Sequence, residues 1–205
     1  MTDPQLAMVG LAAATVASGL MVLAPDWRLV AIGLWLGYGA LALVVGTSLV
    51  FSAGLVKLVG GSLAVGVLWL ASRPIRPSGP RPGGLVGRLG FRVIAFLLVW
   101  LSAWSLGRME WLSLAGLSAV ARAVGAMLLT MGLCQVGLFQ HPFRVGIGLL
   151  ATVAGFEAVY APLEPSLAVA AMMVAVQLGL ALAAGYLASR WAWEPPGQPV
   201  TERRR

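Results

Sequence analysis

The chain has 205 residues, of which 60% are hydrophobic and only 10% are charged, and its formal net charge is +7. Soluble domains carry about 25% charged residues, and no soluble fold of this size could bury so much apolar surface. The composition therefore excludes a soluble protein. It also excludes the nucleic-acid binding that a pI near 11.1 would otherwise suggest, because the arginines lie between and after apolar runs.

Apolar runs of membrane-spanning length dominate the chain. A bilayer core of about 30 Å needs about 20 apolar residues per helix, so the runs predict an all-α bundle of about seven transmembrane helices. A single helix over residues 29–72 would extend about 65 Å, so a break near Gly46 is expected. The seven predicted helices cover residues 5–24, 29–45, 49–72, 91–106, 112–139, 145–160 and 166–189.

These helices also set the predicted domain organisation. Three helices occupy residues 1–72, and a basic loop rich in Pro and Gly follows at 73–90. Four more helices occupy 91–190, and a polar cytoplasmic tail occupies 191–205. The N-terminal run has no basic segment before it, so we expect a retained first helix rather than a signal peptide.

The arginine distribution predicts the orientation. If successive helices cross the membrane in alternating directions, Arg108 is the one loop arginine on its side of the membrane. All other loop arginines then lie on the opposite side. The positive-inside rule then places the N-terminus outside and the C-terminus inside, in a cell (inner) membrane. The arginines on the predicted cytoplasmic side are Arg28, Arg73, Arg76, Arg81, Arg88, Arg92, Arg144, Arg190, Arg203, Arg204 and Arg205.

Three ionisable residues remain inside predicted helices: Lys57, Arg122 and Glu157. Each costs about 2.5 to 3.5 kcal/mol at a helix centre, so such residues usually face the protein interior and indicate a functional site. The helical rise places Lys57 about 12 Å, Glu157 about 5 Å and Arg122 about 15 Å from the outer helix ends. A pair between Glu157 and either cation would offset much of the desolvation cost.

Simpler interpretations of these residues stand beside the functional one. Lys57 could extend its stem to the membrane surface, and Arg122 with Glu157 could form a purely structural ion pair. Gln177, inside the seventh predicted helix, is expected to donate a hydrogen bond between helices. No phosphate-binding loop, histidine pair or cysteine cluster occurs, so the sequence predicts no catalytic residues, no metal and no cofactor.

Two segments resemble known membrane subunits. The stretch Ser52-Ala53-Gly54-Leu55-Val56-Lys57-Leu58-Val59 resembles the lysine-bearing helix of the component E membrane subunit of formate-hydrogenlyase-type hydrogenases. The stretch Gln140-His141-Pro142-Phe143-Arg144-Val145-Gly146-Ile147-Gly148, which leads to Glu157, is similar to the small four-L subunit (subunit K) of respiratory complex I. The resemblance extends over about residues 28–191. The glutamate follows Arg144 by thirteen positions, about a turn later than in that subunit.

The resemblance implies a non-catalytic membrane subunit of an energy-converting redox complex. Lys57 and Glu157 would then lie on the hydrophilic axis of a membrane arm, Arg122 would add an ionisable residue, and Gln177 and Arg144 would support them. Implied partners are antiporter-like and quinone- or hydrogenase-module-like subunits, together with the lipid bilayer and no nucleic acid. The alternative is a structural scaffold or assembly subunit whose charges hold helices together.

Overall fold

The structure, a computed structural model, describes residues 4–48, 51–72, 85–108, 118–160 and 166–193. All its regular elements within these ranges are α-helices, which confirms the all-α part of the predicted fold class. Residues 29–72 form two helices rather than one, as their length required. The seven helices are α1 (Pro4–Leu23), α2 (Trp27–Ser48), α3 (Phe51–Ala71), α4 (Leu85–Arg108), α5 (Ala119–Leu138), α6 (Pro142–Tyr160) and α7 (Leu167–Trp193).

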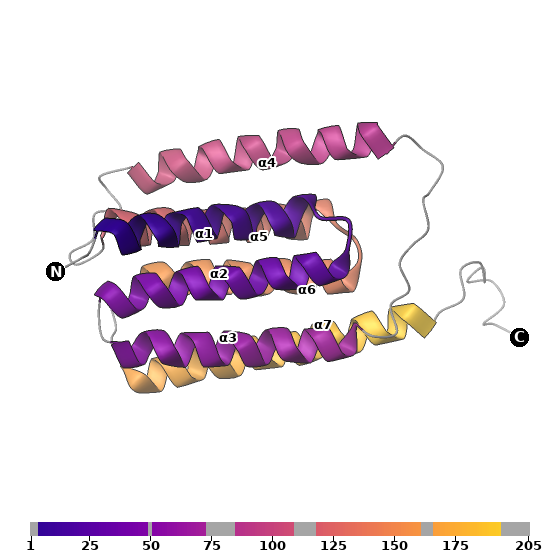
Figure 1. Ribbon diagram of the computed structural model, residues 1–205. Coiled ribbons are helices and arrows are strands. Elements are labelled where there is room, and N and C mark those ends of the chain that lie inside the picture. The colour runs from indigo at the N-terminus through magenta and orange to yellow at the C-terminus, as the bar shows by residue number, and fades with distance from the viewer. Residues whose placement is uncertain (1–3, 49–50, 73–84, 109–117, 161–165, 194–205) are drawn as a thin grey trace, which may run out of the picture.

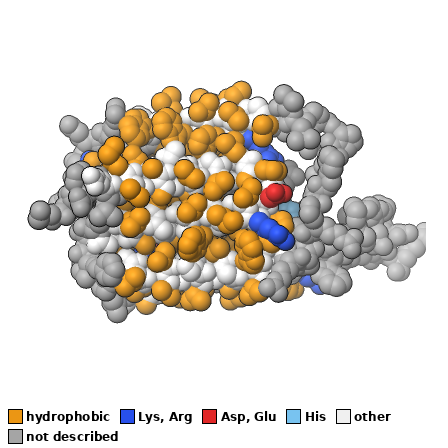
Figure 2. All heavy atoms as spheres, in the orientation of Figure 1, with side chains coloured by type: hydrophobic (Ala, Val, Ile, Leu, Met, Phe, Trp, Pro, Cys, Tyr) orange, Lys and Arg blue, Asp and Glu red, His pale blue; other side chains and the backbone are white. Residues whose placement is uncertain are grey.

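Six of these helices, α2 to α7, are long and apolar enough to cross a membrane, whereas the apolar part of α1 is shorter. Large apolar side chains also cover the exterior, as the face drawn in Figure 2 shows. Such side chains need no burial when lipid surrounds them. The molecule therefore has the architecture of a multi-pass membrane protein.

The helices form two layers of three, with α4 at one edge (Figure 1). One layer is α1, α2 and α3, and the other is α5, α6 and α7; across the layers α1 packs on α5, α2 on α6 and α3 on α7. Because α4 adds one crossing between the layers, each facing pair of helices runs in the same direction. Buried residues make up 6% of the apolar part of α4 but 56% of α2 and of α6, so the core lies between the two layers.

The most extensive helix contact joins α5 to α6 and depends on glycine. A Cβ atom at Gly132 would lie 2.5 Å from Thr152 N and 2.6 Å from Gly148 O. A Cβ atom at Gly155 would similarly clash with the backbone of Leu129. Small residues let helix backbones approach closely, and this approach fixes α6 against α5.

The structure corrects the predicted start of two helices. Helix α4 begins at Leu85, so the last six residues of the predicted 73–90 loop are helical. Helix α5 begins at Ala119 instead of residue 112, because the Ser118 hydroxyl accepts a hydrogen bond from Ala121 N–H at 3.1 Å and caps the helix. The apolar runs alone could not show either effect, since helices extend beyond the hydrocarbon core and begin at caps.

The predicted C-terminal boundary also moves. Helix α7 continues to Trp193, three residues into the predicted tail at 191–205. Helix α7 extends into the membrane interface, where arginine and tryptophan side chains are well accommodated, and the prolines come only after its end. The remainder of the predicted loop, residues 73–84, and the tail from 194 lie outside the described residues.

Candidate functional site

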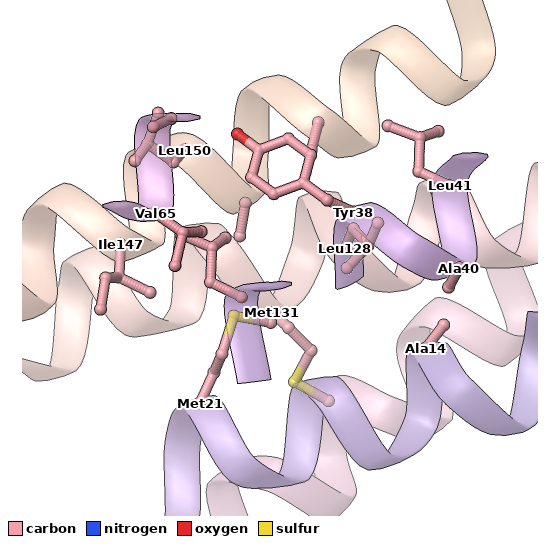
Figure 3. Packing of buried hydrophobic residues seen from close by; sticks show 14 of the residues in the cluster. Ala14, Met21, Tyr38, Ala40, Leu41, Val65, Leu128, Met131, Ile147 and Leu150 are labelled. Atoms are coloured by element: carbon pink, nitrogen blue, oxygen red, sulfur yellow. The ribbon is translucent and has the colours of Figure 1, made fainter. Parts of the chain in front are cut away.

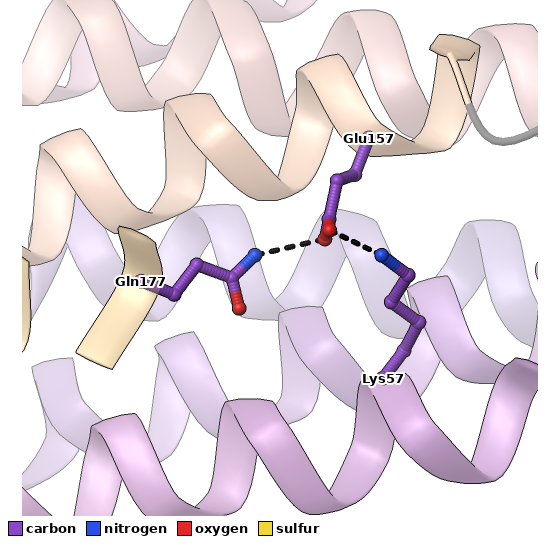
Figure 4. Close-up of polar contacts among 3 residues, drawn as sticks. All are labelled: Lys57, Glu157 and Gln177. Atoms are coloured by element: carbon purple, nitrogen blue, oxygen red, sulfur yellow. Dashed lines mark hydrogen bonds and ion pairs between the residues drawn. The ribbon is translucent and has the colours of Figure 1, made fainter. Parts of the chain in front are cut away.

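Two of the three predicted intramembrane charges meet inside the bundle. Lys57 of α3 donates a hydrogen bond from Nζ to Oε1 of Glu157 on α6, and the two form an ion pair. Their side chains are only 4% and 2% exposed. Figure 4 shows the pair between the two helix layers. Lys57 therefore does not extend to the membrane surface, which excludes that interpretation.

Gln177 of α7 completes this arrangement. Its Nε2 donates a hydrogen bond of 2.8 Å to the second carboxylate oxygen, Oε2 of Glu157, and its side chain is buried. The prediction of an interhelical donor at this position is therefore confirmed. Each carboxylate oxygen of Glu157 has a donor, and the donors come from two different helices (Figure 4). We call Lys57, Glu157 and Gln177 the buried polar cluster.

Glycines on α3 bring the helices of this cluster together. A Cβ atom at Gly60 would lie 2.7 Å from Val174 on α7, and one at Gly61 would clash with the ring of Tyr38 on α2. Lys57 precedes Gly61 by one helical turn and therefore shares its face. The same close packing that brings α2 and α7 onto α3 thus directs the Lys57 side chain inward.

The cluster is a charged site that stays neutral as a whole. An isolated ion in an apolar interior is very unfavourable, but a hydrogen-bonded pair of opposite charges offsets much of that penalty. Carboxyl and amino groups belong to the side-chain groups that take part in proton transfer. The arrangement is therefore compatible with two roles. A proton or another cation can replace the Lys57 ammonium group at the Glu157 carboxylate, or the cluster can serve only to join α3, α6 and α7.

Tyr38 is a neighbour that the sequence did not single out. It is 1% exposed and belongs to the core cluster drawn in Figure 3, with Val65, Leu128 and Leu150. Its hydroxyl has no hydrogen-bond partner among the described residues, and the Glu157 carboxylate acts on it electrostatically. The available signal was a tyrosine in the middle of an apolar helix, away from the interfaces where tyrosine usually lies.

Arg122 does not join the buried polar cluster. Because α5 begins at Ala119, Arg122 lies in the first helical turn and not about 15 Å into the helix, as the expected start at residue 112 implied. No ion pair links it to any residue that the structure describes, and its Nε atom is buried without a hydrogen-bond partner there. Of the two pairings that the sequence left open, the structure has Glu157 with Lys57 and not with Arg122.

Arg144 lies at the other end of α6 from Glu157. The two residues are thirteen positions apart, which corresponds to about 20 Å along the helix. Its Nη2 donates hydrogen bonds to the backbone oxygens of Ala24 at 2.7 Å and Pro25 at 3.1 Å, in the turn between α1 and α2. Arg144 therefore supports the fold at the helix ends and does not contact the buried polar cluster.

A cavity of about 270 Å³ lies between α1, α4 and α5, away from the cluster. Its lining includes Met8, Leu11, Trp100 and Met127 and is almost entirely apolar. The Thr15 hydroxyl at its wall already donates to the backbone oxygen of Leu11 at 2.9 Å. The cavity offers no chemistry. Within the described ranges, no three His, Cys, Asp or Glu side chains lie close enough together to hold a metal ion.

The buried polar cluster is thus the strongest candidate for a functional site in the described part of the chain. Comparisons with protein-family models, with curated proteins and with solved structures find no match to this chain.

Proposed function

We propose that this chain is a membrane subunit whose buried polar cluster contributes to proton or ion translocation in an energy-converting redox complex. The complex would be of the complex-I-related or membrane-bound hydrogenase type, and this subunit would be non-catalytic. The observation that carries the proposal is the Lys57–Glu157 ion pair, buried between the two layers with Gln177 on the second carboxylate oxygen. Ionisable residues at such positions commonly mark proton and ion pathways.

The proposed topology has seven crossings, with the N-terminus outside and the C-terminus in the cytoplasm of a cell (inner) membrane. Arg28, Arg92, Arg144 and Arg190 support it, because they all lie towards the end of the bundle where α2, α4 and α6 begin. We call this the basic end. An excess of arginine is typical of the cytoplasmic side. Glu157 lies near the opposite end, so the cluster would be nearer the outer surface.

Tyr38 adds support for a role in translocation. Its buried hydroxyl lies under the electrostatic influence of Glu157 and has no hydrogen-bond partner in the described ranges. Buried polar atoms usually bond to protein or to ordered water. A water bound to this hydroxyl would extend the cluster from α3, α6 and α7 towards α2, which is what a relay of protons requires.

A structural scaffold remains the second candidate. Lys57 and Gln177 together satisfy both oxygens of Glu157, and a fully paired buried carboxylate is also what a helix-joining contact requires. In this alternative the cluster joins α3, α6 and α7, and the proton stays in place.

A set of three variants separates the two candidates. Glu157→Gln and Lys57→Met each leave one unpaired partner, whereas the double variant removes both charges together. Replacement of a buried ion pair by neutral groups is often tolerated in stability. We expect the double variant to assemble with its partner subunits like the wild type but to lose redox-linked proton pumping.

Pumping is measured in membrane vesicles with a pH-sensitive dye, and assembly by co-purification of the tagged chain. Gln177→Leu serves as a matched control, because it removes a buried donor to the same carboxylate without removing a charge. Normal pumping by an assembled double variant would reject translocation and favour the scaffold. Co-purification also tests the predicted antiporter-like and quinone- or hydrogenase-module-like partners, which mass spectrometry would identify.

A further inference from the structure

Two arginines lie against one aromatic ring at the basic end. The guanidinium carbon of Arg144, on α6, is 4.3 Å from the ring centroid of Phe139. That of Arg92, on α4, is 4.9 Å from the same centroid. Phe139 follows directly after α5, so three helices bring two positive charges to one point. The two guanidinium groups make the electrostatic potential at this point positive, which favours a bound anion.

Backbone oxygens already accept hydrogen bonds from one of the two terminal nitrogens of Arg144. Its Nη2 atom is held by the carbonyl oxygens of Ala24 and Pro25, which fixes the direction of the guanidinium plane. Its Nη1 atom is buried and has no hydrogen-bond partner among the residues that the structure describes. A buried guanidinium N–H without an acceptor is unfavourable, so Arg144 needs an acceptor that the described residues do not supply.

His141 adds a third nitrogen-bearing side chain to this corner. Its Nδ1 accepts a hydrogen bond of 3.2 Å from Phe143 N–H, so the neutral ring carries its proton on Nε2. Burial, and next the positive charge of Arg144, lower the pKa of His141 below its ordinary value of 6.5. His141 therefore senses the positive potential of this corner, and a bound anion would reduce that potential.

We infer that Arg92 and Arg144, on either side of the α5–α6 turn, form a binding site for a phosphate group, and that an anionic phospholipid supplies it. Arginine presents several fixed N–H donors that match phosphate oxygens. The site lies at the end of a bundle whose exterior is apolar, where lipid headgroups lie. Basic pockets between transmembrane helices are known to bind phospholipid headgroups. This inference is independent of the proposed function.

The test measures lipid retention by the full-length protein in nanodiscs. Phosphatidylglycerol is titrated into a phosphatidylcholine background, and native mass spectrometry counts the lipids that stay bound. The variants are Arg92→Gln and Arg144→Gln, with Arg92→Lys to separate charge from guanidinium geometry. Arg190→Gln is the matched control, because Arg190 is an exposed arginine at the same end, on α7.

We expect preferential retention of phosphatidylglycerol by the wild type. A basic side chain near the membrane surface contributes about 1 kcal/mol to anionic lipid binding, so Arg92→Gln should weaken retention about fivefold. Arg92→Lys should weaken it less, and Arg190→Gln should leave it within about twofold, since one rim charge outside the site contributes little. Arg92→Gln is the decisive variant, because Arg144→Gln also removes the hydrogen bonds to Ala24 and Pro25.

A second titration adds inorganic phosphate to the nanodiscs that contain phosphatidylglycerol, and it distinguishes the sources of the phosphate group. Displacement of phosphatidylglycerol by phosphate, dependent on Arg92, would support a site that reads the phosphate group alone. Failure of phosphate to compete would support a site that also needs the lipid chains. Equal retention of the two lipids by the wild type, or equal losses in Arg92→Gln and Arg190→Gln, would overturn the inference.

Discussion

The buried polar cluster and the basic end hold their charges in different ways within one bundle. Lys57 is paired with a carboxylate and shielded from the surroundings on every side. Arg92 and Arg144 instead share the ring of Phe139, and Arg144 also uses two backbone carbonyl oxygens. The interior thus uses a full opposite charge, whereas the helix ends use an aromatic face and dipoles.

Depth in the membrane explains this difference. The bundle interior is shielded from bulk water, so a charge there needs a formal counter-ion. Near the helix ends water and lipid headgroups remain accessible, so weaker partners suffice. Loss of a partner should therefore be most damaging at Lys57 and Glu157, and progressively less damaging towards the helix ends.

The largest effect is expected from breaking the ion pair. Glu157→Gln or Lys57→Met should each lower the free energy of unfolding by about 3 to 5 kcal/mol, because each leaves a buried partner unpaired. The double variant should regain most of this loss. Unfolding in mixed micelles measures all three. Additive losses in the double variant would show that the two side chains do not stabilise each other.

The α5–α6 contact that holds Glu157 in place should be the next most sensitive. Gly132→Ala places a methyl group against Thr152 and Gly148 and should cost about 1 to 3 kcal/mol. Gly137→Ala on the same helix meets open space, and should stabilise α5 by about 0.5 to 1 kcal/mol. Thermal unfolding compares the stabilities of the two variants. Similar losses of stability would show that Gly132 does not act by allowing α5 and α6 to approach closely.

A smaller loss is expected at the basic end. Arg144→Met removes two hydrogen bonds from a charged donor to the α1–α2 turn and should cost about 1.5 kcal/mol. Chemical denaturation compares it directly with Glu157→Gln. If Arg144→Met proved the more damaging, the proposed relation between depth and the need for a counter-ion would fail.

The smallest effect is expected from His141 and depends on pH. Because the pKa of His141 is lowered in the folded protein, the unfolded chain binds more protons below pH 6.5. The stability contribution is therefore present above that pH and is lost as the pH falls through the folded pKa. His141→Asn keeps an acceptor for Phe143 N–H and should flatten the stability profile between about pH 5 and 7. An unchanged profile would assign the slope to other groups.

The sequence predicted the helices well because span length is a local property. Each apolar run must match the membrane thickness, so seven helices could be placed from composition and breakers alone. The start of α5 could not be placed this way, since the Ser118 cap depends on backbone geometry. That single difference moved Arg122 from about 15 Å into the helix to its first turn, at about the same distance from the helix end as Glu157.

The site was predictable only in part, because its partners come from different helices. Lys57 and Glu157 could be identified because a charged side chain inside a membrane helix has a high free-energy cost. Gln177 could be identified as a polar amide within an apolar helix. Which cation would pair with Glu157 depended on the packing of α3 and α6. Tyr38 was missed for a related reason. Its burial depends on contact with Gly61 of another helix, and a contact between two helices cannot be read from a single sequence.

The sequence separation of the ion-pair partners also affects the order of events during synthesis of the protein. Lys57 and Glu157 are 100 residues apart, with the whole of α4 and α5 between them. During synthesis α3 therefore reaches the membrane long before its counter-ion exists. Until α6 emerges, Lys57 has no Glu157 to pair with, and its long side chain allows the ammonium group to stay at the lipid–water boundary. Pairing with Glu157 is then a late event of biogenesis, when the second layer closes over the first.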